Sequence, residues 1–348
     1  MDSGGILVQR RLVLEKWNDK ALKFVEEDHF DPDLSPNECL IEIQTSSVSS
    51  TDVFIMTGRY PASDLKNKPP LTLGYDFVGK IIRIGASVEG FKIGDTVCDM
   101  PLIGGHAKYI VRAEHDLIKV PDNIDTAEAT SLVLTWMTAY QLLYRTTAKR
   151  AVDNKEPIFV QGGTGAVANA IVALASRAGC TVFTTARKEY HSRLKQQGVH
   201  PIDYRVPKWW LKLRKETGTG VSVSFEGVCP DSFKSAAYML NSKGKLVIYG
   251  AHAPVFSGKD QSVLAMAKTL APIALATLMP WGRSVEFYSI STTRRKHPTW
   301  FKEDLTTLFE CLSRGEIKIE VTERIKLGEV NSALLKLEKG KYVGKIVL

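Results

Sequence analysis

The stretch Val160-Gln161-Gly162-Gly163-Thr164-Gly165-Ala166-Val167-Ala168 decides the fold of this chain. An apolar run over 158–160 leads into it, and an alanine-rich run over 166–178 leaves it. The second run stops at Gly179, a residue type that commonly ends helices. A further strand-like run covers 181–184. The order of strand, glycine turn, helix and strand is the context in which a glycine motif predicts nucleotide binding.

The glycine motif has the form G-x-G-x-x-A. Gly163 permits the tight turn, Gly165 lets the backbone approach a pyrophosphate, and Ala168 is small enough for close packing of helix on strand. Free amide groups at the helix start, together with the helix dipole, favour phosphate. An ordinary tight turn is the alternative interpretation. We expect the dinucleotide to lie on Gly162, Gly163, Thr164, Gly165, Ala166 and Val167.

Length and composition predict two globular domains in a reducing compartment. The 348 residues are comfortable for two domains, and 44% of them are hydrophobic. The 5 cysteines are scattered, which favours buried thiols over a disulfide framework. The first residues lack the basic and apolar regions of a signal peptide. We therefore expect a cytoplasmic protein.

The most apolar run of the chain, 262–279, is interrupted by Lys268 and Pro272. A membrane-spanning helix needs an unbroken apolar stretch, so we predict no transmembrane span. The insert 254–279 is rich in alanine and leucine. We interpret it as a lid or a substrate-lobe helix, with a dimer contact as the alternative.

Positive charge gathers in three segments, and the formal net charge is +8. Such a balance attracts nucleic acid or anionic membranes. The chain lacks the basic helix or aromatic-basic module of known nucleic-acid readers, so we predict no nucleic-acid partner. We expect these basic segments to form solvated surface, with one of them binding a cofactor phosphate. They cover 187–193, 205–215 and 294–302.

Two kinds of periodicity divide the chain. Short apolar runs between glycine turns fill the first 110 residues and predict a mainly β module. Between 156 and 250, strand-like runs alternate with helical stretches, which predicts an α/β fold with a doubly wound parallel sheet. The expected strands of this sheet are 158–161, 181–185, 222–225 and 245–249.

Taken in order, several short motifs resemble the medium-chain dehydrogenase/reductase superfamily. They are Gly74-Tyr75-Asp76-x-x-Gly79, Gly94-Asp95-x-Val97, Gly104-Gly105-x-Ala107-x-Tyr109, Thr138-Ala139-Tyr140, the glycine turn and the terminal run 343–348. Within it, the chain looks like the zinc-free quinone oxidoreductase branch, including synaptic-vesicle-protein-like members and trans-acting enoyl reductases. The resemblance implies a GroES-like β-rich domain from 1–128 and 286–348, with a Rossmann NADPH-binding domain, 129–285, inserted. Family habit implies a homodimer.

The resemblance also decides the expectation about metal. Aligned with zinc-dependent relatives, two ligand positions fall on Ser49 and Tyr75, and the third falls on or near Leu134. Zinc is bound by thiolate, imidazole or carboxylate, so we predict no metal. The histidines show no metal-ligand spacing and are expected at the surface or as caps. Without zinc to ionise an alcohol, hydride transfer to an electrophilic quinone or α,β-unsaturated carbonyl is easier, because hydrogen-bond donors can stabilise the developing enolate.

The end of the second strand indicates the nucleotide. Thr185 and Ala186 are followed by Arg187 and Lys188, and no carboxylate precedes Glu189. These cations suit a 2′-phosphate, so we predict NADPH rather than NADH; a solvated helix start is the alternative. The resemblance adds Tyr204, from the I-x-Y-R stretch, and Gly250 near the nicotinamide half of the cofactor.

The resemblance places candidate catalytic residues at Ser49, Asp52, Tyr60 and Thr138. Tyr60 stands where quinone reductases keep a tyrosine whose hydroxyl can donate to a carbonyl; a core or rim aromatic is the alternative. We interpret Asp52 as an orienting or structural carboxylate, because no histidine partner is evident nearby. Ser49 replaces a usual asparagine and Phe54 a usual tyrosine, which favours a small apolar conjugated carbonyl or quinone as substrate.

Three functional interpretations stay open. The first is an NADPH-dependent, zinc-independent oxidoreductase acting on quinones or enones. The second is a trans-acting enoyl reductase of a polyketide-type pathway, which meets its substrate on an acidic carrier protein. The third is a non-redox member of the fold, either a membrane- or vesicle-associated binding protein or a biosynthetic catalyst that does not consume NADPH.

Overall fold

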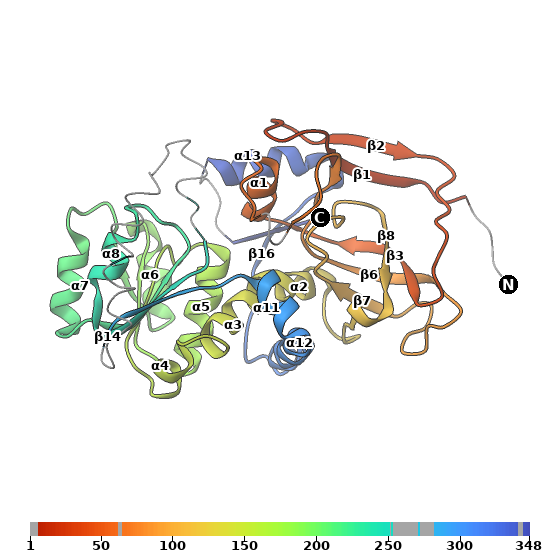
Figure 1. The fold of residues 1–348 in the computed structure, drawn as a ribbon. Helices are drawn as coiled ribbons and strands as arrows, with labels where there is room; N and C mark the ends of the chain where they lie inside the picture. The colour runs from red at the N-terminus through yellow and green to blue at the C-terminus, as the bar shows by residue number, and fades with distance from the viewer. Residues whose placement is uncertain (1–5, 62–64, 251, 253–270, 272–281, 340–343) are drawn as a thin grey trace. The chain divides into compact units, whose positions relative to one another are not determined.

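A computed structural model describes residues 6–61, 65–250, 252, 271, 282–339 and 344–348. The chain forms two compact units. The first combines Met1–Leu134 with Thr299–Leu348, and the second is Thr135–Pro298. Figure 1 labels the elements of both. The predicted domain boundaries, after residues 128 and 285, stay a prediction.

Most strand pairs of the first unit are antiparallel, and its sheets confirm the predicted β-rich module (Figure 1). Its five-stranded sheet has the order β8 (Tyr109–Ala113), β3 (Glu38–Thr45), β6 (Phe77–Ile84), β7 (Thr96–Asp99) and β9 (Ile118–Lys119). A three-stranded sheet has the order β2 (Lys23–Glu27), β1 (Gln9–Leu14) and β5 (Leu71–Thr72). The first unit also holds the helices α1 (Ser50–Met56), α2 (Thr126–Ser131), α12 (Pro298–Ser313) and α13 (Val330–Glu338).

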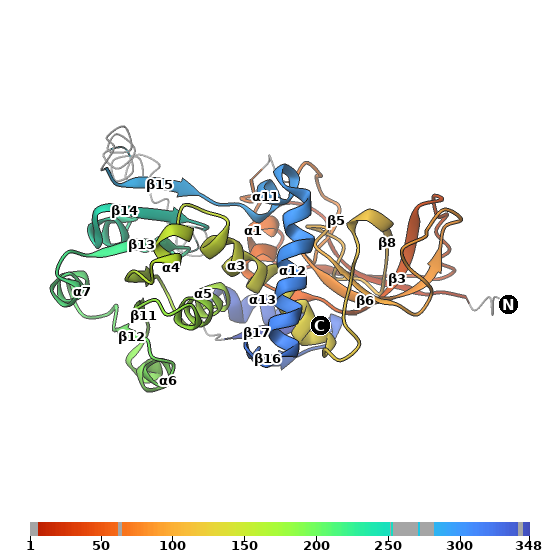
Figure 2. The ribbon, with the colours of Figure 1, turned by 90° about the horizontal axis from the view of Figure 1, so that it is seen from below.

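The C-terminal segment completes the unit that the N-terminal segment begins. Strand β17 (Lys345–Val347) pairs antiparallel with β4 (Ser47–Val48) and parallel with β16 (Val321–Arg324). The Asn331 side chain hydrogen-bonds both backbone groups of Leu22, at 2.8 and 2.9 Å. Figure 2 lets the reader follow the blue C-terminal elements back to this unit. Strand pairing between distant segments therefore anchors both chain ends in one unit.

The second unit is built on a six-stranded sheet in which every pair is parallel. The chain starts in the middle of this sheet, runs to one edge, and returns to the other side of its first strand. That reversal confirms the doubly wound α/β fold and puts a switch point between the carboxyl ends of β10 and β13. The sheet order is β12 (His200–Ile202), β11 (Val182–Thr185), β10 (Ile158–Val160), β13 (Val221–Glu226), β14 (Leu240–Ile248) and β15 (Ser284–Phe287).

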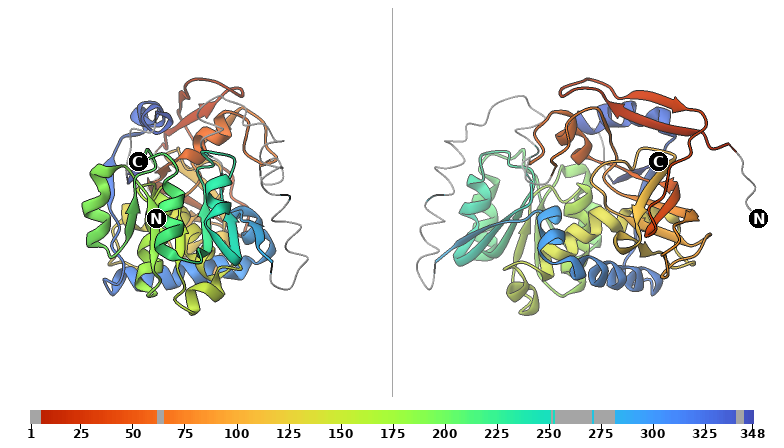
Figure 3. Two further views of the ribbon diagram at one scale, coloured as in Figure 1. Left: turned by 90° about the vertical axis from the view of Figure 1, so that its left-hand side faces the viewer. Right: turned by 45° about the vertical axis from the view of Figure 1, so that its right-hand side comes forward.

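Helices pack around this sheet (Figure 3). Helix α5 follows the glycine turn and ends just before Gly179, whose φ of 88° only glycine adopts easily. The buried Phe159 ring stacks on Trp209 with ring centroids 5.6 Å apart, which ties β10 to α7. The helices of this unit are α3 (Met137–Tyr144), α4 (Lys149–Asp153), α5 (Ala166–Arg177), α6 (His191–Gln196), α7 (Trp209–Thr217), α8 (Lys234–Tyr238) and α11 (Ile290–Lys296).

Two expectations concern the apolar insert. The lid, substrate-lobe or dimer-contact role predicted for 254–279 lies outside the described residues, apart from the single residue Ala271. Within the described part of the chain, every helix is too short or too polar to cross a membrane.

Candidate functional site

The glycine turn connects the carboxyl end of β10 to α5. Hydrogen bonds to the neighbouring strand, β11, hold the turn in place. The amide of Gly162 donates to Thr185 Oγ1 at 2.8 Å, and the amide of Gly163 donates to the Thr185 carbonyl at 2.9 Å. Thr185 itself is buried. Helix α5 has Gly165 as its N-cap, and no side chain caps its first amide groups. These donors point beyond the helix start and suit an anion.

The glycines of the turn differ in what they permit. Gly162 has a φ of 69°, so it makes the turn that the sequence assigned to Gly163. A Cβ on Gly163 would lie 2.2 Å from Thr184 Oγ1, so this glycine lets the turn pack against β11. A Cβ on Gly165 would lie 3.3 Å from the Gly162 carbonyl oxygen. Ala168 is buried in α5, as the motif requires.

Beyond β11, one of the predicted phosphate-binding cations, Arg187, is held by neighbours to which the sequence assigned no role. Arg187 Nη2 donates to the Tyr190 hydroxyl at 3.2 Å, and the guanidinium lies 5.3 Å from the centre of the Tyr190 ring. Arg187 Nη1 is 3.3 Å from Glu189 Oε1. Lys188 is exposed and makes no ion pair within the described part of the chain. Sequence adjacency was the only signal for Glu189 and Tyr190.

The segment after β12 adds a second ion pair to this region. Arg205 donates to both carboxylate oxygens of Asp203, at 3.0 and 2.8 Å. Hydrogen bonds from Arg205 lower the pKa of Asp203 from 3.8 to about 2. Tyr204, between them in sequence, is 47% exposed. We call Arg187, Lys188, Glu189, Asp203 and Arg205 the exposed ionic cluster.

The carboxyl end of β13 carries a buried acid, Glu226. Oε1 of Glu226 accepts the amides of Val228 and Cys229, at 2.7 and 2.9 Å. Its Oε2 is buried without a hydrogen-bond partner among the described residues. Burial raises the pKa of Glu226 from 4.5 to about 7. The sequence placed Glu226 at a strand end but gave no signal of its burial.

Gly250 lies against the same strand ends. A Cβ on Gly250 would lie 3.1 Å from the Gly227 carbonyl oxygen. That oxygen also accepts the backbone amide of His252 at 3.1 Å. The loops after β13 and β14 are thereby held together where Rossmann-type sheets bind their ligand.

In the first unit, Ser49 and Asp52 begin α1 together. The Ser49 hydroxyl accepts the Thr51 amide at 3.2 Å, and Asp52 Oδ2 accepts the Ser49 amide at 2.8 Å, which forms a capping box. Asp52 is fully buried, and its Oδ1 accepts the Gly74 amide at 3.3 Å. Its carboxylate therefore ties the start of α1 to the segment around Gly74.

His106 corrects two expectations from the sequence. It is fully buried, not at the surface, with Nδ1 3.2 Å from Ser46 Oγ. Its Nε2 lies 3.4 Å from Asp52 Oδ1, so Asp52 does have a histidine beside it. The pair forms because the His106 backbone crosses the Gly74 segment, where the His106 amide donates to the Leu73 carbonyl at 2.7 Å. Sequence spacing carried no signal of this crossing.

Asp76 and Lys345 extend this network, although the sequence assigned them no role beyond the motifs that contain them. The Ser47 amide and hydroxyl each donate to Asp76 at 2.8 Å. Burial raises the pKa of Asp76, and Lys345 opposes that shift. Burial lowers the pKa of Lys345, against the attraction of Asp76 and Asp52. We call Asp52, Asp76, His106 and Lys345 the buried ionic cluster.

The remaining candidate catalytic residues lie in both units. The Tyr60 and Tyr75 hydroxyls are 2.5 Å apart, and Tyr75 is 1% exposed. Tyr60 is therefore positioned by a buried tyrosine of the same unit. Thr138 is buried in α3 of the second unit, whereas Ser49, Asp52 and Tyr60 belong to the first. Their action on one substrate stays a prediction.

The donor set does not fit zinc at the family's ligand positions. Ser49 is engaged as a helix cap, Tyr75 pairs with Tyr60, and Leu134 lies in the π-helical turn Leu132–Trp136. None of the three supplies a thiolate, imidazole or carboxylate. Within the described residues, no group of three or more His, Cys, Asp or Glu side chains could hold a metal ion.

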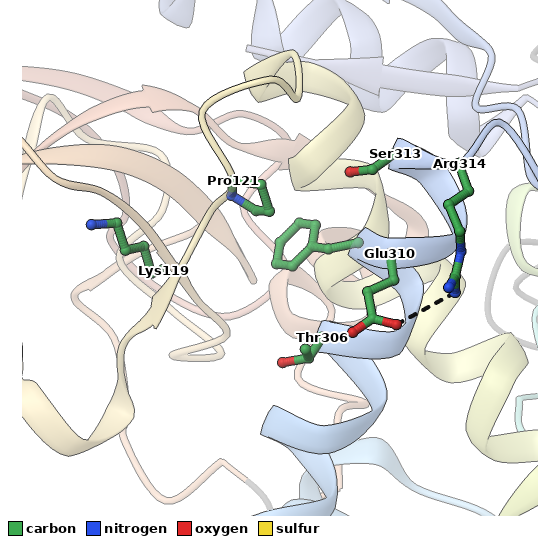
Figure 4. A pocket seen from close by; sticks show the side chains of 7 residues that line it. Lys119, Pro121, Thr306, Glu310, Ser313 and Arg314 are labelled. Atoms are coloured by element: carbon green, nitrogen blue, oxygen red, sulfur yellow. Dashed lines mark hydrogen bonds and ion pairs between the residues drawn. The ribbon is translucent and has the colours of Figure 1, made fainter.

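A surface pocket of the first unit lies apart from all these residues (Figure 4). Its volume is about 300 Å³. Its cations are already paired, because Lys119 lies 2.8 Å from Asp95 and Arg314 lies 3.4 Å from Glu310. It contains none of the predicted site residues and is lined by Lys119, Pro121, Thr306, Phe309, Glu310, Ser313 and Arg314.

Comparison with protein families gives two matches along the chain. Residues 35–122 match the alcohol dehydrogenase GroES-like domain, and residues 197–348 match a family described as zinc-binding dehydrogenase.

The chain aligns with different shares of the length of three curated relatives. A synaptic vesicle membrane protein VAT-1 homolog of Danio rerio is 25% identical over 91% of this chain and 65% of its own length. Highly reducing polyketide synthase 40 of Fusarium pseudograminearum is 26% identical over 94% of this chain and 12% of its own. A quinone oxidoreductase of Lama guanicoe is 28% identical over 73% of this chain and 76% of its own. The chain thus spans less than two thirds of the first two relatives.

Solved structures share the fold over nearly the whole chain. A quinone oxidoreductase of Pseudomonas syringae superposes with a TM-score of 0.82 at 21% identity, covering 98% of this chain and 99% of its own. Mycobacterial Rv1454c complexed with NADPH superposes with a TM-score of 0.82 at 23% identity, with the same coverage of 98% and 99%.

Proposed function

Because the chain belongs to the medium-chain dehydrogenase/reductase superfamily, in its quinone oxidoreductase-like branch, we propose that it is a zinc-independent, NADPH-dependent reductase of quinones or α,β-unsaturated carbonyls. One observation carries this proposal. The uncapped start of α5, after a turn in which Gly163 leaves no room for a side chain, lies in the same unit as Arg187 and Lys188, which follow β11.

The residues present fit NADPH. Gly162 to Val167 would hold the pyrophosphate through backbone amides, and Arg187, Lys188 and Tyr204 would hold the 2′-phosphate. Thr185 supports the turn through its bond from the Gly162 amide. Gly250, where the lack of a side chain lets the loop after β14 pack against Gly227, is the residue proposed near the nicotinamide half. When bound, NADPH supplies the hydride.

The chain's own residues would orient and polarise the acceptor. The hydroxyls of Ser49, Tyr60 and Thr138 are the proposed donors toward a substrate carbonyl, which would stabilise charge developing on its oxygen. Asp52 would act indirectly, since its carboxylate is buried and fixes the start of α1. Phe54, where many relatives have a tyrosine, supports an apolar substrate.

The first test is a fluorescence titration with NADPH and then with NADH. We expect the double variant Arg187→Ala/Lys188→Ala to weaken NADPH binding by about 10- to 100-fold and NADH binding much less, because two charge-assisted contacts to the phosphate are lost. The matched control is Lys212→Ala/Lys215→Ala, which removes the same charge from exposed positions of α7.

The outcomes separate the proposed functions. Selective loss in the first variant supports the site and directs a screen of NADPH oxidation with quinones and enones. Equal losses of NADPH affinity in both double variants would show that the effect depends only on net charge. If the protein binds neither nucleotide, the reductase proposal fails and a non-redox role takes its place.

A second candidate function follows from the polyketide synthase relative, which aligns with 94% of this chain. In this proposal the chain reduces an enoyl group carried by an acidic carrier protein, and exposed lysines such as Lys208, Lys212 and Lys215 attract that partner. Binding of a carrier protein should then weaken steeply between low and physiological salt. Binding that does not respond to salt would count against this function.

A further inference from the structure

We propose that Glu189 sets the nucleotide preference of the site. Its carboxylate competes with the 2′-phosphate of NADPH for Arg187 and can accept a hydrogen bond from the 2′-hydroxyl of NADH. This inference rests on the proposed nucleotide binding. It predicts a protein that uses both nucleotides, with a smaller preference for NADPH than Arg187 and Lys188 alone would give.

Local backbone geometry holds the carboxylate beside the guanidinium. Residues Lys188–Tyr190 form a short helical turn, and the Tyr190 amide donates to the Arg187 carbonyl at 2.9 Å. Glu189 Oε1 therefore lies 3.3 Å from Arg187 Nη1. On its other side, Arg187 is fixed by the Tyr190 ring and hydroxyl. The guanidinium is thus presented with one nitrogen already facing an anion.

The charges of the exposed ionic cluster nearly cancel. Asp203 engages Arg205 with both oxygens, and the low pKa of Asp203 keeps it ionised at neutral pH. Glu189 engages Arg187, which leaves Lys188 as the cation without an ion pair among the described residues. A 2′-phosphate would gain Lys188 directly but would have to displace Glu189 from Arg187 or lie beside its negative charge.

The same carboxylate suits a ribose that carries no phosphate. In dinucleotide folds an acidic side chain after the second strand accepts hydrogen bonds from the ribose hydroxyls. Glu189 follows the second strand of this sheet, β11, and its side chain is 53% exposed. An exposed ion pair is weak, so either ligand can open it. The arrangement therefore narrows the difference in affinity between NADPH and NADH.

Fluorescence titration of the Glu189→Gln variant tests this role. We expect NADPH to bind about 3- to 10-fold tighter, because the competing charge is gone, and NADH to bind about 2- to 5-fold weaker. The matched control is Glu216→Gln, which removes another exposed negative charge of the same unit, one that lies 3.8 Å from Lys212. The control should change both affinities by less than about 1.5-fold.

A double-mutant cycle assigns the effect to Arg187. In an Arg187→Ala background, Glu189→Gln should tighten NADPH clearly less, because no guanidinium is released and only the direct repulsion between carboxylate and phosphate is removed. The inference is overturned if Glu189→Gln behaves like Glu216→Gln, or if the gain persists in full without Arg187. If the unmodified protein binds neither nucleotide, the proposed function itself fails. If it binds both and Glu189→Gln leaves the ratio of the NADPH and NADH affinities unchanged, only the role of Glu189 fails.

Discussion

The buried ionic cluster of the first unit and the exposed ionic cluster of the second use the same side-chain types for different ends. Asp52, Asp76, His106 and Lys345 are at most 6% exposed and come from four separate segments. The members of the exposed cluster come from two short segments and pair mostly with neighbours in sequence. Removing one buried charge leaves its partners uncompensated at low dielectric, whereas an exposed charge is screened by water. We therefore expect burial to decide whether a charge governs stability or ligand affinity.

The largest expected effect is that of Lys345→Met. The substitution leaves the buried carboxylates of Asp76 and Asp52 without their cation, so the free energy of unfolding should fall by about 3–5 kcal/mol. Urea unfolding followed by circular dichroism measures this change. In the control Lys336→Met, an exposed pair with Glu323 is lost, and the change should stay within about 0.5 kcal/mol. Similar losses in both variants would remove burial as the deciding factor.

The next effect depends on pH and concerns Glu226. Because burial raises its pKa from 4.5 to about 7, the folded protein holds a proton that the unfolded chain releases. This group's contribution to stability is therefore present below pH 4.5 and is lost as the pH rises to about 7. Glu226→Gln keeps a neutral acceptor, so it should match the unmodified protein at low pH and exceed it by about 3 kcal/mol at pH 8.

Asp203 has a pKa shift of the opposite sign and so serves as a comparison in that experiment. Its pKa is lowered to about 2, so its contribution is present above 3.8 and is lost as the pH falls. The unmodified protein should be more stable than Asp203→Asn at neutral pH, and this difference should shrink on acidification. Glu226→Gln should be more stable than the unmodified protein at pH 8, and that difference should also shrink on acidification. Urea unfolding at several pH values follows both. A Glu226→Gln difference that does not change with pH would contradict an ionising, buried Glu226.

The smallest effect on stability is expected for Arg187→Ala/Lys188→Ala. Arg187 is 37% exposed and Lys188 is exposed, so the free energy of unfolding should change by less than about 0.5 kcal/mol although NADPH binding weakens. Unfolding curves recorded beside the titrations check this. A large loss of stability would mean that the exposed cluster also holds the fold.

Local patterns were enough to predict much of the second unit. The helix after the glycine turn, the parallel strands and the cations after β11 all follow from residues close together in sequence. The turn residue was assigned wrongly, because two glycines stand in sequence: Gly162 has the positive φ, whereas Gly163 is required by packing against Thr184.

What the sequence determined by itself is the architecture and the proposed nucleotide turn, since periodicity and glycine spacing are properties of neighbouring residues. Only the tertiary structure decided that His106 lies beside Asp52, that Lys345 is buried near Asp76, and that Glu226 is buried with a raised pKa. Those contacts join segments brought together by strand pairing and chain crossing. Their energies depend on burial, which no local pattern of residues specifies.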